Sequence, residues 1–182
     1  ASSIVFVFLL GIIVVYLVLA AQFESFVHPF VIMLTVPLAM GGGLLGLFIF
    51  DESLNIYSQI ALIILVGLSA KNGILIVEFA NQLRDRGEEF SEALLNAASV
   101  RFRPIIMTGL TTIAGAIPLI FSFGAGSETR IVIGIVILTG VAAATLFTLF
   151  IVPVAYSILS KNTSTPGAVA KRLEGEMLKH RG

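Results

Sequence analysis

Cysteine and tryptophan are absent from this chain of 182 residues, and only 12% of its residues are charged. The lack of cysteine excludes a disulfide framework, cysteine-ligated zinc and thiol catalysis. Two histidines are too few for a histidine-based metal site, so we expect no bound metal. Basic and acidic residues number 11 each, so no overall positive field favours nucleic-acid binding.

Apolar residues, in contrast, are in large excess. They make up 57% of the chain, against about 45–50% in an ordinary soluble domain. A hydrocarbon core of roughly 30 Å takes about 20 helical residues to cross. Runs of that length cover residues 3–21, 28–50, 56–80, 104–123 and 131–159. The core of a soluble protein explains one such run but not five. We therefore predict an all-α integral membrane fold, with a transmembrane bundle over residues 1–160.

Two segments outside the predicted spans are long enough to carry structure of their own. Residues 82–103 are charged, with apolar residues on one helical face, and predict an amphipathic connection at the membrane surface. Residues 161–182 begin as a linker and predict a tail that is either a short amphipathic helix or a frayed, solvated end.

Basic residues are distributed unevenly along the chain. The connection and the tail together hold nine of the 11 lysines and arginines, and two spans separate them, so both lie on one side. The positive-inside rule places that side in the cytoplasm and the N-terminus outside. The chain starts at Ala1 without the basic flank of a signal peptide, so we expect that further protein precedes it.

Lys71 is the most informative polar residue, because it lies in the middle of the third predicted span. A central lysine costs roughly 2.5–3.5 kcal/mol to insert and is expected to face the bundle interior and pair with a carboxylate. Glu78 shares its helical face but lies about 10 Å further along the axis, too far for direct contact. The sequence holds no other deep acidic residue, so the partner of Lys71 is expected elsewhere. A purely structural ion pair or a contact with a backbone carbonyl is the alternative.

Polar residues also follow one face of the fourth span. Arg101 and Thr108 are seven residues apart, and Thr111 and Thr112 extend the strip of hydroxyls. Spacing alone favours a structural interpretation, in which Arg101 anchors the helix at the membrane surface and the threonines bond carbonyls one turn back.

Small residues form a second pattern. Gly42 and Gly46 make a GxxxG motif, which fits either helix dimerisation or close packing within one bundle. The sequence contains no P-loop, no HExxH and no GxSxG, and no pair of carboxylates within a span is placed for acid–base catalysis. We therefore expect that the protein is not an enzyme.

Several stretches resemble one family, the resistance-nodulation-division (RND) efflux transporters. GLSAKNGILIVEFA at 67–80 and RFRPIIMT at 101–108 resemble two long motifs of its hydrophobe/amphiphile (multidrug) branch. AQFESF at 21–26, VPL at 36–38 and GAGS at 124–127 also fit, so the resemblance extends over residues 1 to about 160.

The resemblance implies the last five of twelve transmembrane helices in a homotrimeric pump of the bacterial inner membrane. Such pumps are secondary active transporters that exchange drug for protons, driven by the proton-motive force without a cofactor. They work with a periplasmic adaptor and an outer-membrane channel. Lys71, Arg101 and Thr108 match the family's proton relay, opposite an aspartate pair in the N-terminal half. Asn72, Glu78 and Thr112 are candidate supporting residues. The chain alone is expected not to transport.

Two other interpretations remain open at this point. The chain could be a non-transporting membrane anchor or assembly bundle, in which Lys71 only fixes packing. It could also belong to a related proton-driven protein that exports lipids or assists protein secretion, and the substrate-binding regions would discriminate between these.

Overall fold

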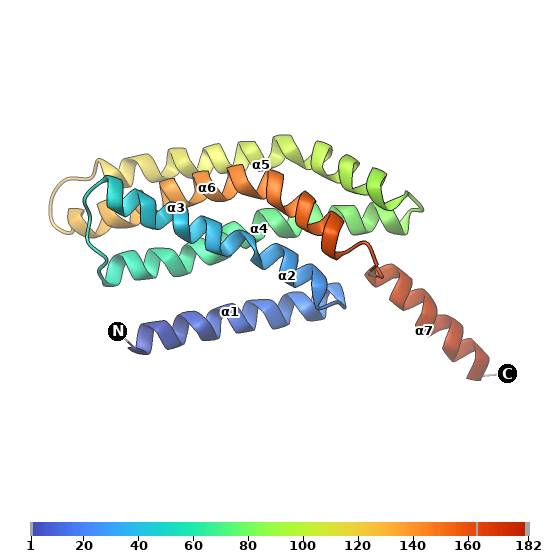
Figure 1. Ribbon diagram of the computed structural model, residues 1–182. Coiled ribbons are helices and arrows are strands. Elements are labelled where there is room, and N and C mark those ends of the chain that lie inside the picture. Colours follow the sequence, from blue (N-terminus) through green and yellow to red (C-terminus); the bar gives the residue numbers. More distant parts are fainter. Residues whose placement is uncertain (1, 163, 181–182) are drawn as a thin grey trace.

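The computed structural model describes residues 2–162 and 164–180, and the regular elements in these ranges are all helices (Figure 1). They are α1 (Ser2–Phe23), α2 (Val27–Met33), α3 (Thr35–Ile49), α4 (Ile56–Asp85), α5 (Phe90–Ile120), α6 (Ser127–Leu159) and α7 (Pro166–His180).

Five helical segments are long and apolar enough to cross a membrane, which confirms the predicted all-α class and five-helix organisation. Four are the single helices α1, α4, α5 and α6, and the fifth combines α2 with α3 over Val27–Ile49. The α1 segment is the least enclosed, with 6% of its most apolar stretch buried. Large exposed side chains on the bundle, such as Phe6, Phe48 and Phe150, give it the apolar outer surface that contact with lipid requires.

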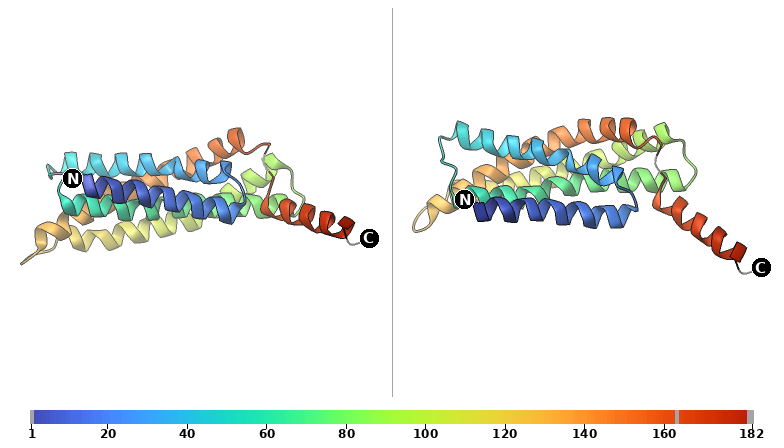
Figure 2. Two further views of the ribbon diagram at one scale, coloured as in Figure 1. Left: turned by 90° about the horizontal axis from the view of Figure 1, so that it is seen from below. Right: turned by 60° about the horizontal axis from the view of Figure 1, so that its bottom comes forward.

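The turns between helices gather at two opposite ends of the bundle (Figure 1). We name them the Arg84 end, where α1 meets α2 and α4 meets α5, and the Asp51 end, where α3 meets α4 and α5 meets α6. Helix α7 follows α6 beyond the Arg84 end and projects away from the bundle (Figure 2). Arg130, at the Asp51 end, donates to the carbonyls of Phe123 and Ala125, both over 3.3 Å.

The second segment is interrupted at Leu34, between α2 and α3. Pro37 explains the break, because it has no N–H to donate to the carbonyl of Met33, one turn back. The hydroxyl of Thr35 donates to the carbonyl of Ile32 over 2.8 Å and satisfies one of the carbonyls beside the break.

Helix α6 is the central element and packs against α3, α4 and α5. Its contact with α3 depends on two glycines. A Cβ on Gly42 would overlap Ala143, and a Cβ on Gly46 would overlap the side chain of Thr139. Both glycines therefore pack within the bundle, against another helix of the same chain.

The α4–α5 region differs in outline from the expected pattern. Helix α4 continues to Asp85, and α5 runs unbroken from Phe90 to Ile120, so residues 90–103 are the first turns of a long helix. Pro104 thus lies inside α5 rather than in its first turn. In the tail, residues 166–180 form the helix α7, whereas Arg181 lies outside the described residues.

Candidate functional site

Lys71 lies near the middle of α4. Ile56 begins this helix, and the side chain of Asn55 caps it by accepting hydrogen bonds from the backbone of Tyr57 and Ser58, both over 3.0 Å. Lys71 follows fifteen residues later, about 22 Å along the axis. Its side chain is exposed, and within residues 2–162 and 164–180 it makes no hydrogen bond or ion pair. The bundle therefore presents an uncompensated cation at mid-depth.

A small cavity adjoins Lys71 and joins three helices. Its volume is about 30 Å³, enough for a water molecule. It is lined by Leu68, Lys71, Asn72, Thr108, Gly109, Thr112 and Val141. Lys71 and Asn72 come from α4, Thr108 and Thr112 from α5, and Val141 from α6. The structure thus brings together four of the polar residues that the sequence singles out.

The threonine hydroxyls beside Lys71 are engaged with their own helix. Thr108 donates to the carbonyl of Pro104 over 3.0 Å or to that of Ile105 over 3.1 Å, and Thr112 donates to the carbonyl of Thr108 over 2.8 Å. This is the bonding one turn back that the spacing favours. Each hydroxyl oxygen still has lone pairs with which to accept from a water in the cavity.

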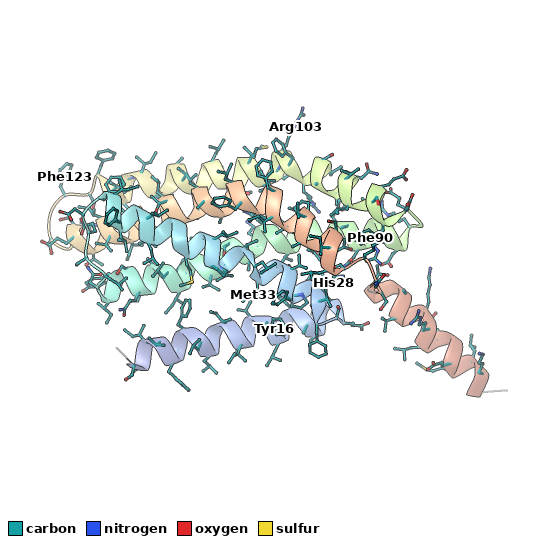
Figure 3. All side chains as sticks on the ribbon, in the orientation of Figure 1. Tyr16, His28, Met33, Phe90, Arg103 and Phe123 are labelled. Carbon is teal, nitrogen blue, oxygen red and sulfur yellow. The ribbon has the colours of Figure 1, made fainter. Side chains whose placement is uncertain are left out.

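Arg101 is not part of this cavity. Its guanidinium lies 5.0 Å from the ring centroid of Phe79, a cation–π contact, and its Nε is buried without a hydrogen-bond partner among the described residues. Arg103 points outward from α5, away from the other helices (Figure 3). Seven residues separate Arg101 from Thr108, so about 10 Å of helix lies between the arginine and the hydroxyl.

Glu78 is also separate from Lys71, as its spacing predicts. It lines a different cavity, at the Arg84 end, together with Gln22, Asn81 and Asp85. In the described part of the chain Glu78 has no hydrogen bond or ion pair.

Sequence reasoning missed two buried hydroxyls of α6. Thr145 and Thr148 each hold an Oγ1 with no hydrogen-bond partner among the described residues. The Oγ1 of Thr145 is 2.7 Å from where a Cβ on Gly109 would lie, so it directly adjoins the helix that carries Thr108. The signal that could have found them is the one applied to Lys71, a polar residue within a long apolar run.

A cluster of rings at the Arg84 end was missed as well. Tyr156 is fully buried and stacks on His28 and Phe90, with ring centroids 5.7 Å and 5.4 Å away. Figure 3 labels His28 and Phe90 at this end of the bundle. The Tyr156 hydroxyl accepts from Arg84 over 3.1 Å and donates to Asn81 over 2.7 Å. The cluster ties α2, α4, α5 and α6 together.

Five apolar helices with a lysine at mid-depth define a multi-pass helical membrane protein. Residues 1–160 match the AcrB/AcrD/AcrF family of RND multidrug efflux transporters. The chain belongs to this family, as the resemblance at 67–80 and 101–108 predicted.

Individual relatives agree with this assignment. The chain is 48% identical over 160 residues to an uncharacterized transporter of Haemophilus influenzae, a match that covers 84% of this chain and 16% of the relative. It is 41% identical over 166 residues to multidrug resistance protein MdtC of Erwinia amylovora, covering 91% and 16%. It is 42% identical over 153 residues to multidrug export protein AcrF of Escherichia coli K12, covering 84% and 15%.

The chain therefore spans about a sixth of the length of these relatives. The family match, over residues 1–160, includes the whole bundle and ends before α7.

Proposed function

We propose that this chain forms the C-terminal transmembrane part of a proton-driven RND efflux permease and supplies the lysine side of its proton relay. The observation that carries the proposal is Lys71, an exposed cation at mid-depth that has no anionic partner in the described residues. A lysine is costly at this depth, so a counter-charge from another part of the transporter must compensate it.

An aspartate pair on a helix of the N-terminal half would supply this counter-charge. While the aspartates are ionised, Lys71 lies against them, and their charges stabilise one another. Protonation of the aspartates removes the attraction, so the lysine side chain is free to turn toward the hydroxyls of Thr108 and Thr112. The resulting shift of α4 against α5 would be passed on to the drug-binding regions.

After this turn, the Lys71 side chain would lie in the cavity beside it. The cavity is about 30 Å³ and polar on the side formed by Asn72, Thr108 and Thr112. A water held there could accept a hydrogen bond from the ammonium and donate to a threonine oxygen. Arg101 acts at a distance, because its positive charge raises the potential on the path toward the Arg84 end.

The distribution of charge supports an orientation. Arg84, Arg86 and the basic residues of α7 lie at or beyond the Arg84 end, whereas Arg130 lies at the Asp51 end. The positive-inside rule puts the Arg84 end and the C-terminus in the cytoplasm and the N-terminus in the periplasm. The complete pump would be a homotrimer in the bacterial inner membrane, joined to a periplasmic adaptor and an outer-membrane channel.

The test places Lys71→Ala in the complete transporter and measures drug resistance together with proton uptake into vesicles. We expect expression to be unchanged and both activities to be lost. Lys161→Ala, which removes an exposed lysine after α6, is the matched control and should retain both. Full activity of the Lys71 variant would overturn the relay role and leave Lys71 with a structural role in packing. Proton uptake coupled to lipid or protein export instead of drug export would favour a different branch of the superfamily.

A further inference from the structure

A groove in the half of the bundle nearer the Arg84 end joins α4, α5 and α6. Its volume is about 420 Å³. It is lined by Ile76, Ala98, Ser99, Phe102, Leu149 and Phe150. Five of these residues are apolar and one, Ser99, carries a hydroxyl. We name it the Ser99 groove, and the relay proposed above does not use it.

The Ser99 groove opens on a different side of the bundle from Lys71. Ile76 follows Lys71 by five residues, which turns it by about 140° around α4. Ile76 is buried beneath the groove, whereas Phe102 and Phe150 border it and are 48% and 65% exposed. The N-terminal half of the transporter is proposed to cover the side of Lys71. The groove is therefore left on a side that lipid can reach.

Arg103 lies beside the rim of the Ser99 groove. It follows Ser99 by four residues, so the two share a face of α5. Its side chain is exposed and points outward from the helix (Figure 3). Side chains on a helix lean toward the N-terminus, so that of Arg103 leans over the turn that carries Ser99. Within residues 2–162 and 164–180 neither residue makes a hydrogen bond or ion pair. An exposed guanidinium and an exposed hydroxyl are thus available to one acceptor from outside the bundle.

This face of α5 changes from polar to apolar toward the middle of the bilayer. Arg103 directly precedes the apolar run 104–123, about 30 Å of helix, and so lies at the level of the lipid headgroups. Leu110 and Ile117 follow it at steps of seven residues on the same face and are 62% and 42% exposed. A cation at the headgroup level above an exposed apolar stripe matches the order of groups in a phospholipid.

The charge around Arg103 favours a lipid of net negative charge. The nearest acidic residue on this face of α5 is Glu92, about 16 Å away along the axis. Helix α6 carries no acidic residue after Glu128, and Glu78 of α4 lines the cavity beside Gln22 instead. The ammonium of a zwitterionic headgroup would find no carboxylate near its own phosphate. The positive charge of Arg103 is uncompensated here, so an anionic headgroup fits better.

A neighbouring groove provides a contrast within the same bundle. It lies on the other side of Phe150 and has a volume of about 460 Å³. Its lining is apolar throughout, because it consists of Leu34 and six residues of α6 between Phe150 and Leu159. Acyl chains can lie there, but no side chain of its lining can recognise a headgroup. The polar rim distinguishes the Ser99 groove from this surface.

We propose that the Ser99 groove binds a phospholipid of net negative charge. Phosphate oxygens accept hydrogen bonds from the guanidinium of Arg103 and the hydroxyl of Ser99. One acyl chain lies in the groove against Phe102 and Phe150, and the other follows Leu110 and Ile117. An unselective coat of lipid would cover the same surface but would not discriminate between headgroups, so selectivity at this site is the property to measure.

The experiment uses the complete transporter, with Phe102 replaced by the photoreactive p-benzoylphenylalanine. The protein is reconstituted with equal amounts of phosphatidylglycerol, phosphatidylserine and phosphatidylethanolamine, irradiated and analysed for lipid adducts at residue 102 by mass spectrometry. We expect each anionic lipid to exceed phosphatidylethanolamine about fivefold, the effect of one basic residue at the membrane surface. Equal adducts of all three lipids would overturn the proposal. Absence of any lipid adduct would mean that protein covers the groove, which also overturns it. Enrichment of phosphatidylglycerol alone would overturn net charge as the basis of recognition.

Variants in the same background test the two parts of the site. Arg103→Gln should abolish the preference for anionic lipids. Arg86→Gln removes another exposed arginine at the Arg84 end, outside the groove, and should keep the preference. An unchanged preference in Arg103→Gln, or an equal loss in both variants, would contradict the role of Arg103.

A second pair of variants fills one groove at a time. Ser99→Phe places a ring in the Ser99 groove and should lower the yield of all lipid adducts. Val154→Phe places the same ring in the neighbouring apolar groove and should leave the yield unchanged. Equal yields in the two variants would overturn the placement of the acyl chain. Because lipid adducts are measured, Lys71→Ala should not alter the result, and failure of the relay proposal would leave this one standing.

Discussion

Tyr156 of α6 donates its hydroxyl hydrogen to Asn81 of α4 over 2.7 Å, across 75 positions of sequence. Both side chains are buried, and the hydroxyl also accepts from Arg84. Inside an apolar bundle, removal of one partner of such a bond leaves a buried polar group unsatisfied, which costs folding free energy. The link joins the helix that carries Lys71 to the central helix of the bundle.

Removal of this hydroxyl should destabilise the fold. Tyr156→Phe keeps the ring stack on His28 and Phe90 but leaves Asn81 without its donor. We expect a loss of about 1–3 kcal/mol in the free energy of unfolding, measured by titration with a denaturing detergent. Tyr16→Phe removes a hydroxyl that donates to the carbonyl of Phe26 in an exposed position and should cost less. Equal losses in the two variants would show that burial of the Tyr156 bond adds nothing.

The second prediction concerns the glycine at which α3 packs closely against α6. A side chain at Gly46 would overlap Thr139, so Gly46→Val should destabilise the bundle by about 1–3 kcal/mol through overpacking. Gly41→Val is the matched control, because a Cβ at Gly41 meets no atom within 4 Å. Thermal unfolding in detergent measures both. A stable Gly46 variant would mean that α3 can move away from α6 without cost.

The helices themselves could be predicted from the sequence, because apolar length alone distinguishes a span. The apolar run at 3–21 predicts the first span, which is found as Ser2–Phe23, and the run that begins at residue 56 predicts the third, which begins there as α4. Lys71 is recognised for the same reason, because a single charge within an apolar run is visible without knowing which residues surround it in space. The break at Leu34 and the continuity of α5 through Pro104 were not foreseen, because each depends on how local bonding competes with packing.

The site could be predicted only in part. Thr108 and Thr112 line the same cavity as Lys71, whereas Arg101 lies against Phe79, although it shares a helical face with Thr108. Heptad spacing places residues on one face but says nothing of how two helices are offset along their axes. Asn81 and Tyr156 illustrate the same limit, because their partnership depends on the packing of α4 against α6.

The third prediction concerns the start of α4, the helix that carries Lys71. Asn55 accepts from two backbone amides, and Ser58 accepts from the backbone N–H of Asn55 over 2.8 Å, which completes a capping box. Asn55→Ala should cost about 0.5–2 kcal/mol of unfolding free energy. Ser53→Ala, an exposed serine before the cap, should be neutral. Hydrogen exchange of the first turn of α4 should rise in the Asn55 variant only, and equal exchange in both would contradict the role of the cap.

The threonines of α5 allow the proposed relay to be tested with matched substitutions. Thr108 and Thr111 are both exposed, but only Thr108 lines the cavity beside Lys71, and Thr111 bonds only the carbonyl of Met107, over 2.8 Å. Loss of one hydrogen bond of about 1.4 kcal/mol to the ammonium or its water corresponds to about tenfold in rate. In the complete transporter, Thr108→Val should therefore slow proton-coupled efflux about tenfold, and Thr111→Val should leave it near the parent rate. Both substitutions replace a hydroxyl on the same helix by a methyl group and keep the branch at Cβ. A general effect on helix packing would therefore slow efflux by both variants alike. Slower efflux in the Thr108 variant alone would therefore indicate a role of the cavity itself. Slower efflux in the Thr111 variant alone would place the proton path on the other side of α5.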